Sequence, residues 1–288
     1  MHKLLSFLFL MLNVAFSLQA QNIKGGRIVE TTMPCRLLMG VSERAYSIYL
    51  PASYDTELER TYPVLYLMHG GGESNTVWQR NGRLREKADS LINCHAAEEM
   101  IIVCPEGNEE NMMYFNAPHW RYGDFFFQEF IPYIENTYRV REGRENRAIA
   151  GFSMGGGAAT VYGVHHPEMF CMVYDISGYL RRIEMEWLKR DPSAPWRQRV
   201  IEQNNPIKRV LDGSAADVER WRTVDWFIAV GDQDFTLEAN MDFVKALRQR
   251  GIPYQMRVGS GNHNWLWVTP QMCDAICRVR KSATLTAK

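Results

Sequence analysis

The sequence predicts an α/β fold in which a mostly parallel β-sheet is covered by helices on both faces. Short apolar runs typical of buried strands alternate along the chain with longer segments of helical spacing. Parallel neighbouring strands need a crossover between them, so this alternation favours a parallel sheet with helices as the crossovers. No repeat, low-complexity stretch or long linker divides the chain, which indicates one large domain.

The predicted strands and helices follow one another in a regular order. Segments with strand-like apolar patterns are residues 44–50, 62–68, 100–104, 147–152, 170–176, 224–230 and 254–258. Segments with helical spacing are residues 84–95, 125–138, 155–165, 235–249 and 266–280. The alternation fails at residues 178–223, a charge-rich stretch that contains tryptophans. This stretch predicts a helical insertion before the strand at 224–230, either a lid over one end of the sheet or a surface elaboration.

The first 20 residues have the pattern of a secretory signal peptide. A basic start that ends at Lys3 precedes an apolar run over residues 4–18, and the small residue Ala20 follows. The run is short for a membrane span, which needs about 20 residues, and Asn13 interrupts it. We therefore expect cleavage after Ala20, export to the periplasm or the medium, no stable membrane insertion, and a single mature domain over residues 21–288.

Charge and cysteine content exclude several classes of function. The chain has 33 Lys and Arg and 33 Asp and Glu residues, so its formal net charge is zero, and it has no large basic cluster. This balance argues against nucleic acid as a partner. The six cysteines form neither a C-x-x-C pair nor the His/Cys spacing of a zinc site. We therefore expect no metal and no organic cofactor, and the sequence specifies no oligomeric state.

One motif indicates reactive chemistry: the pattern G-x-S-x-G at residues 151–155, with Ser153 at its centre. It lies between a predicted strand and a predicted helix, the setting in which this serine becomes a nucleophile. The turn is too tight for side chains at Gly151 and Gly155. Because average composition alone yields such a pattern in about one chain of this length in ten, the motif needs partners before it indicates an active site.

A glycine-rich loop supplies the first partner. Residues 69–72 follow the predicted strand 62–68 and contain a histidine and three glycines. The backbone N–H groups of such a loop can turn toward an oxyanion, so we expect Met154 together with Gly70 or Gly71 to form an oxyanion hole. His69 is expected to order this loop rather than to act as a base.

Two further loops supply a base and an acid at the same end of the sheet. His263 follows the last predicted strand and is expected to take the proton of Ser153. Two aspartates after the strand 224–230 compete for the third position. We favour Asp234, which lies far enough along its loop to reach His263, whereas Asp232 lies in the tight turn and Asp225 at the opposite end of the strand.

Aromatic residues are frequent in the same loops, where they could stack on a phenolic ring or on sugar faces. We expect Trp78, Trp120 and Trp265 to contact the substrate, and Trp265, two residues from His263, is the strongest candidate. Packing within the core is the alternative for each of them.

Together these segments resemble the esterase family that includes carbohydrate esterase family 1, within the α/β-hydrolase superfamily. The resemblance spans residues 45–278 and rests on residues 62–72, 130–135, 138–140, 147–156 and 261–265. Feruloyl esterases and acetylxylan esterases belong to this family, and esterase D-type hydrolases are related to it. The resemblance implies an α/β-hydrolase fold with Ser153 as nucleophile, His263 as general base and Asp234 as the acid of a triad.

The resemblance and the leader segment together predict an exported serine esterase that removes acyl groups from plant polysaccharide or oligosaccharide. Because aromatic residues crowd the loops, we expect a feruloyl esterase that releases hydroxycinnamates through an acyl-enzyme. Removal of acetyl groups from xylan or another carbohydrate is the alternative within the same chemistry. Acyl transfer to a sugar hydroxyl and a non-catalytic glycan-binding role are the further alternatives.

Overall fold

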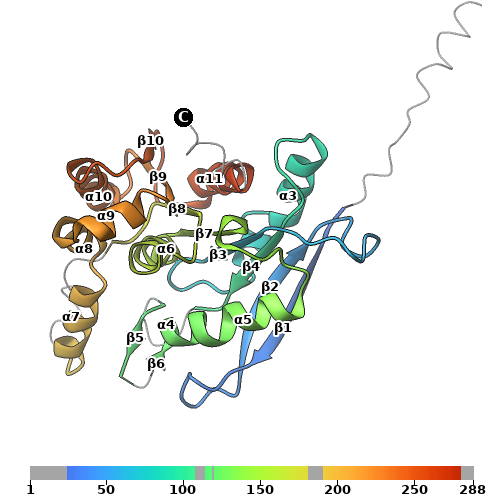
Figure 1. Ribbon diagram of the computed structural model, residues 1–288, viewed down its shortest axis with the longest axis horizontal. Helices are drawn as coiled ribbons and strands as arrows, with labels where there is room; N and C mark the ends of the chain where they lie inside the picture. Colours follow the sequence, from blue (N-terminus) through green and yellow to red (C-terminus); the bar gives the residue numbers. More distant parts are fainter. Residues whose placement is uncertain (1–24, 108–113, 119, 181–190, 280–288) are drawn as a thin grey trace, which may run out of the picture.

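The structure, a computed structural model, describes residues 25–107, 114–118, 120–180 and 191–279 (Figure 1). An eight-stranded sheet with the order β1-β2-β4-β3-β7-β8-β9-β10 forms its centre. The strands are β1 Arg27–Pro34, β2 Glu43–Leu50, β3 Val64–Met68, β4 Ile101–Pro105, β7 Arg147–Phe152, β8 Met172–Ile176, β9 Asp225–Gly231 and β10 Gln255–Gly259. The leader predicted at residues 1–20 lies outside these ranges. Within them, no helix has the length and apolar character that crossing a membrane requires.

The sheet is mostly parallel, as the alternation of elements predicts. All neighbours from β4 to β10 are parallel, whereas β1 and β2 are antiparallel additions at one edge. The register of β3 with β7 pairs Val64 with Arg147 and Met68 with Gly151. The glycine loop after β3 and the serine turn after β7 therefore leave the sheet next to each other. The predicted α/β-hydrolase fold is confirmed.

The central strands are buried on both faces. On β3, Val64, Tyr66 and Met68 face one hydrophobic core, and Leu65 and Leu67 face the other. All five side chains are fully buried. Since successive side chains of a strand point to opposite faces, a strand between two cores has a continuous apolar sequence without polar alternation.

Helices cover both faces of the sheet (Figure 1). The core that contains Leu65 is completed by α2 Val77–Arg80, α3 Leu84–Asn93 and α11 Trp265–Arg278. The core that contains Tyr66 is completed chiefly by α5 Ile131–Thr137, α6 Met154–His165 and α10 Leu237–Gln249. Short elements outside these layers include the hairpin of β5 Asn116–Ala117 and β6 Trp120–Arg121 and the 3₁₀ turn Arg144–Asn146.

The helix predicted at residues 125–138 contains a π-helical segment. Helix α4, Tyr122–Phe125, continues through the π segment Phe126–Phe130 into α5. Pro132 lies in the first turn of α5, and because it has no N–H it cannot bond to the carbonyl four residues earlier. The wider π turn directly before it accommodates this break.

The insertion predicted at residues 178–223 is helical where the structure describes it. It contains α7 Ala194–Gln203, α8 Pro206–Asp212 and α9 Ala215–Trp221, and its residues 181–190 lie outside the described ranges. Helix α8 packs on α6 and α10. The buried Trp221 donates its indole N–H to the Val164 carbonyl of α6 at 2.8 Å. Helices α8 and α9 are therefore part of the helical layer, and the lid role stays a prediction.

Candidate active site

Ser153 lies in a sharp turn between β7 and α6. Its backbone has φ 54° and ψ −115°, a conformation that residues other than glycine adopt only when the surrounding structure holds them in it. A Cβ on Gly151 would lie 2.4 Å from the backbone of Gly155, and a Cβ on Gly155 would lie 2.3 Å from the carbonyl oxygen of Met68. Both positions require glycine because α6 begins directly against the ends of β3 and β7.

The turn presents the Ser153 hydroxyl to His263. The Nε2 atom of His263 lies 2.8 Å from Ser153 Oγ, and its Nδ1 atom lies 2.9 Å from both carboxylate oxygens of Asp234. An ionised carboxylate can only accept, so Nδ1 carries the ring proton and Nε2 accepts from the serine. The structure thus brings together the three residues whose order the sequence singled out, in an arrangement that supports proton transfer from Ser153.

Asp234 is an anion held in the protein interior. Its side chain has no exposed surface. Burial raises its pKa. Hydrogen bonds from His263 and from the backbone N–H and hydroxyl of Thr236 together lower the pKa by more than burial raises it, so the net pKa lies below the usual value. The two bonds from Thr236 measure 2.9 and 2.8 Å. A buried carboxylate in this state stabilises an imidazolium on His263.

Asp232, the competing aspartate, connects two loops instead. Its Oδ1 atom accepts from the Gly261 N–H at 3.0 Å, and its own N–H donates to the Gly259 carbonyl at 2.8 Å. These bonds join the loop after β9 to the loop that leads to His263. Asp225, the first residue of β9, lies at the opposite end of the sheet, as expected.

The candidate oxyanion donors are Met154 and Gly71. Met154 is the first residue of α6, and N–H groups in the first turn of a helix have no acceptor within it. The prediction is wrong for Gly70, because its N–H already donates to the Glu73 carboxylate at 2.9 Å and does not face an oxyanion. Gly71 is exposed and lies beside Met154, where a Cβ on Gly71 would be 3.9 Å from the methionine sulfur.

His69 orders the glycine loop, as the sequence predicts. Its side chain is fully buried, and its Nδ1 lies 2.8 Å from the Gly70 carbonyl, which can only accept, so Nδ1 donates to it. Its Nε2 contacts the Gly107 N–H at 2.9 Å and the Glu106 carboxylate at 3.2 Å. In a trans peptide the carbonyl and the following N–H point in opposite directions. The bond from His69 therefore turns the Gly71 N–H away from the histidine.

Two of the three tryptophans expected to contact substrate are core residues. Trp78 is 0 % exposed and Trp120 is 4 % exposed, with the Arg44 guanidinium 5.2 Å above the Trp120 ring. Neither ring has a free face for a ligand, so the prediction is corrected for both. Trp265 is partly exposed and remains a candidate, with its ring edge-on to Trp78 at 5.1 Å.

Two exposed apolar side chains near His263 were not identified from the sequence. Phe235 is 69 % exposed, and its ring centre lies 4.5 Å from that of His263. Leu266 is 87 % exposed and follows His263 by three residues. Large apolar side chains exposed beside polar groups are typical of binding surfaces. Their sequence signal is their position, because one adjoins Asp234 and the other follows His263 closely.

The cysteines differ in how far they are buried. None of the six, all within the described ranges, forms a disulfide, and Cys104 and Cys171 are buried. Burial raises the pKa of Cys104 to about 12 and that of Cys171 to about 11, so both thiols are protonated at neutral pH. In the described ranges, no cluster of three or more His, Cys, Asp or Glu residues could hold a metal ion.

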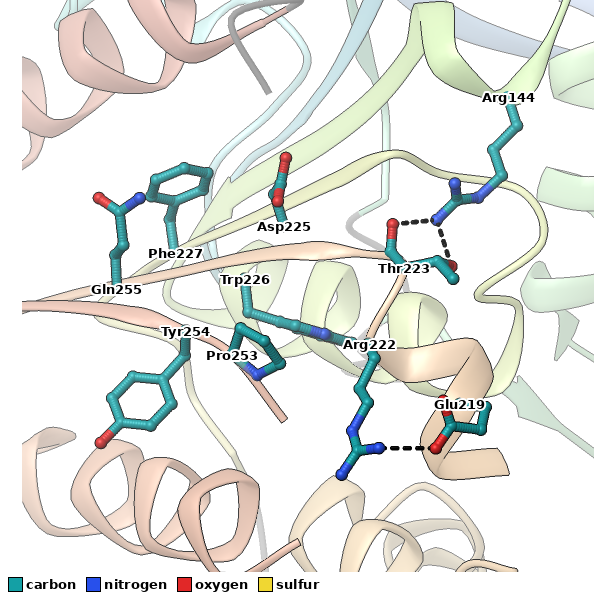
Figure 2. A pocket seen from close by; sticks show the side chains of 10 residues that line it. All are labelled: Arg144, Glu219, Arg222, Thr223, Asp225, Trp226, Phe227, Pro253, Tyr254 and Gln255. Atoms are coloured by element: carbon teal, nitrogen blue, oxygen red, sulfur yellow. Dashed lines mark hydrogen bonds and ion pairs between the residues drawn. The ribbon is translucent and has the colours of Figure 1, made fainter. Parts of the chain in front are cut away.

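A cavity of about 680 Å³ lies at the amino ends of the parallel strands, opposite the Ser153 site (Figure 2). It is lined by the first residues of β9 and β10, Asp225 and Gln255, together with Arg144, Thr223 and other side chains. Figure 2 shows the Arg144 guanidinium directed at Thr223. Ligands of parallel α/β sheets bind at the carboxyl ends of the strands, and this cavity is at the amino ends.

The fold and the Ser153 site define a serine hydrolase of the α/β-hydrolase class. The family model described as "Putative esterase" matches residues 41–279. The chain belongs to this esterase family, and residues 41–279 form a serine carboxylic-ester hydrolase domain.

Several similar proteins carry esterase names. The structure of a ferulic acid esterase is 37 % identical and superposes with a TM-score of 0.83, over 90 % of this chain and 99 % of that one. An esterase of Mycobacterium tuberculosis is 27 % identical over 250 residues, which are 75 % of this chain and 52 % of the relative. An endo-1,4-beta-xylanase/feruloyl esterase of Xylanibacter ruminicola is 32 % identical over 130 residues, 43 % of this chain and 18 % of that protein. The chain thus spans about half the length of the mycobacterial esterase.

Proposed function

We propose that the chain is an exported feruloyl esterase that releases hydroxycinnamates from acylated plant polysaccharide. The observation that carries this proposal is the hydrogen-bonded series from Ser153 through His263 to Asp234 at the carboxyl edge of the sheet. Similarity to a ferulic acid esterase at 37 % identity supports the acyl group. The leader-like pattern of residues 1–20 supports export.

In the proposed reaction, Ser153 Oγ attacks the ester carbonyl carbon while His263 Nε2 takes the hydroxyl proton. The N–H groups of Met154 and Gly71 donate to the negative carbonyl oxygen of the tetrahedral intermediate. His263 then returns the proton to the sugar oxygen, which leaves as an alcohol, and the acyl group stays on Ser153. Water, with its proton taken by His263, attacks the acyl-enzyme, and His263 returns that proton to Ser153 Oγ as the carboxylic acid leaves. Asp234 stabilises the imidazolium formed in each half-reaction.

The exposed apolar residues support an aromatic acyl group. Phe235 offers a largely exposed ring beside His263, and Leu266 adds apolar surface nearby in the sequence. A hydroxycinnamoyl ring packed on Phe235 gains about 0.5–1.5 kcal/mol beyond the burial of area. An acetyl group has no ring and gains none of this, so the side chains favour ferulate over acetate.

Hydrolysis by the purified chain tests the proposal. We expect kcat/KM for methyl ferulate to exceed kcat/KM for p-nitrophenyl acetate, and we expect Ser153→Ala to lower kcat by about 10⁶-fold while the circular dichroism spectrum is unchanged. Turnover retained by the folded Ser153→Ala variant contradicts the mechanism. Acetate release from acetylated xylan without hydrolysis of methyl ferulate selects the carbohydrate deacetylase alternative.

A further inference from the structure

Glu73 accepts hydrogen bonds from two loops that are far apart in the sequence. Its Oε2 atom accepts from the Gly70 N–H at 2.9 Å, within the glycine loop. Its Oε1 atom accepts from the indole N–H of Trp265 at 3.0 Å, across a sequence separation of 192 residues. One half-buried carboxylate therefore connects the glycine loop with the first residue of α11.

On the α11 side, Glu73 is attached to a firmly packed residue. The Trp265 ring lies edge-on to the fully buried Trp78 at 5.1 Å and to Phe152 at 5.9 Å. Phe152 precedes the nucleophile Ser153, and its ring centre lies 4.5 Å from that of His263. Trp265 thus has a fixed position relative to the serine turn and the histidine.

On the other side, Glu73 is bonded to the buried Gly70, and the two glycines that follow have little packing of their own. Gly71 and Gly72 are exposed, and Gly72 has φ 74°. Glycines sample more backbone conformations than other residues, so this loop depends on bonds at its ends for its position. His69 holds the Gly70 carbonyl and Glu73 holds the Gly70 N–H.

We propose that Glu73 is a positioning residue that fixes the Gly71 N–H relative to Ser153 and His263 by joining the glycine loop to Trp265. The inference rests on the proposed roles of Ser153 and Gly71. An ionised carboxylate offers an acceptor oxygen to each of two donors, whereas the amide of glutamine has one acceptor and one donor group. Glutamine at this position therefore keeps one of the two bonds. At the other position its amide NH₂ group faces an N–H donor, and no hydrogen bond forms there.

The test compares Glu73→Gln, Glu73→Ala and Trp265→Phe with the wild type, and Glu30→Gln on the exposed edge strand β1 is the matched control. Rates are measured with p-nitrophenyl acetate, so the result does not depend on a preference for ferulate. A fluorophosphonate titrates active Ser153 and normalises each rate to folded enzyme. We expect kcat/KM to fall about 10-fold in Glu73→Gln and about 100-fold in Glu73→Ala. Removing one oxyanion donor outright typically lowers the rate about 10²- to 10³-fold, so neither variant is expected to exceed that loss.

A second readout separates positioning from a purely structural role. The inhibition constant of phenylboronic acid, which forms a tetrahedral adduct with the serine, is expected to rise in proportion to the loss of kcat/KM, while the dissociation constant of ferulate changes less than twofold. Trp265→Phe keeps an aromatic ring and removes the N–H, and it is expected to cost a smaller factor in rate in the Glu73→Ala background than in the wild type.

The outcomes are distinct. Rates of Glu73→Gln and Glu73→Ala within twofold of the wild type, per titrated site, overturn the positioning role and leave the esterase function intact. Independent, multiplicative effects of Glu73→Ala and Trp265→Phe also overturn it. If Glu73→Ala does not fold, Glu73→Gln and Trp265→Phe decide the question. Hydrolysis by Ser153→Ala instead contradicts the proposed function.

Discussion

Two buried aspartates near the serine turn differ in charge because their surroundings differ. Burial raises the pKa of Asp234, but hydrogen bonds from His263 and Thr236 lower it below the usual value. Asp175 on β8 is 1 % exposed and accepts from the Thr160 hydroxyl at 2.7 Å. Burial, with a smaller contribution from the charge of Asp234, raises the pKa of Asp175 to about 7. The bonds that keep Asp234 ionised are therefore specific to the site that needs an anion.

The raised pKa of Asp175 predicts a pH-dependent stability. The folded state holds this proton up to about pH 7, whereas the unfolded carboxyl releases it near its ordinary pKa of 3.8. Its contribution to stability is therefore complete below about pH 4 and is lost as the pH rises to about 7. Asp175→Asn removes the titration. In urea unfolding at pH 5 and pH 8, we expect the wild type to lose more free energy of unfolding between the two pH values than Asp175→Asn.

Comparing the change with pH, rather than absolute stability, isolates this carboxyl. Other titrating groups contribute equally to both proteins and cancel in the difference. An equal loss of stability in wild type and Asp175→Asn between pH 5 and pH 8 shows that the folded protein does not hold this proton.

At the scale of elements, helix α6 is fixed to the sheet by close contacts at its glycines. A Cβ on Gly163 would lie 2.4 Å from Val173 Cγ2 on β8 and 3.0 Å from the Trp226 ring. Alanine is favoured over glycine in a helix by about 1 kcal/mol. Overpacking in a core costs about 1–3 kcal/mol, and a β-branched valine has little freedom to move aside. The contact therefore outweighs the helix propensity at this position.

We expect Gly163→Ala to lower the free energy of unfolding by up to about 2 kcal/mol, the overpacking cost of about 1–3 kcal/mol less the gain of about 1 kcal/mol in helix propensity. Urea unfolding measures the change. Val173→Ala removes the methyl group that the new Cβ would meet, so adding Gly163→Ala to Val173→Ala is expected to cost less than Gly163→Ala alone. Stabilisation by the single substitution shows that α6 can move away from the sheet.

The sequence predicts those elements whose position and bounds depend on their own residues. The strand β7 has the predicted bounds because its apolar run ends at a glycine turn, and β3 and β9 agree within two residues. Edge strand β1 was not predicted, since most of its residues are exposed and only pairing with β2 makes it a strand. The π segment before Pro132 was also not predicted, because its wider turn keeps a helical hydrophobic pattern.

The residues of the candidate site also fall into those that the sequence predicts and those that it does not. The motif around Ser153 and the loop positions of Asp234 and His263 follow from sequence order, and the structure brings the three together. Burial is not contained in residue type, so Trp78 was expected in the site although it lies in the core. The contact of Glu73 with Trp265 joins segments 192 residues apart and has no local signal in the sequence.

At the scale of the whole molecule, the carboxyl ends and the amino ends of the parallel strands, here called the carboxyl edge and the amino edge, have different roles. The carboxyl edge holds the glycine loop, the serine turn and the histidine loop. At the amino edge, beside the cavity of Figure 2, Arg144 joins neighbouring connections. Its guanidinium donates to the Pro167 carbonyl at 2.8 Å and to the carbonyl and hydroxyl of Thr223 at 2.8 and 3.0 Å. These bonds tie the loop after α6 to the start of β9.

This separation predicts that Arg144→Ala weakens the fold without changing the chemistry. Its loss removes a partly buried charge-assisted bond to the Pro167 carbonyl and two exposed ones to Thr223, so we expect the free energy of unfolding to fall by about 1–3 kcal/mol. The rigid strands between the two edges keep the carboxyl-edge loops in place, so kcat/KM per titrated Ser153 should stay within twofold. Arg85→Ala is the control, because its side chain is 48 % exposed and its contact to Glu86 is 3.8 Å long. A fall of kcat/KM beyond threefold in folded Arg144→Ala shows that the two edges are coupled.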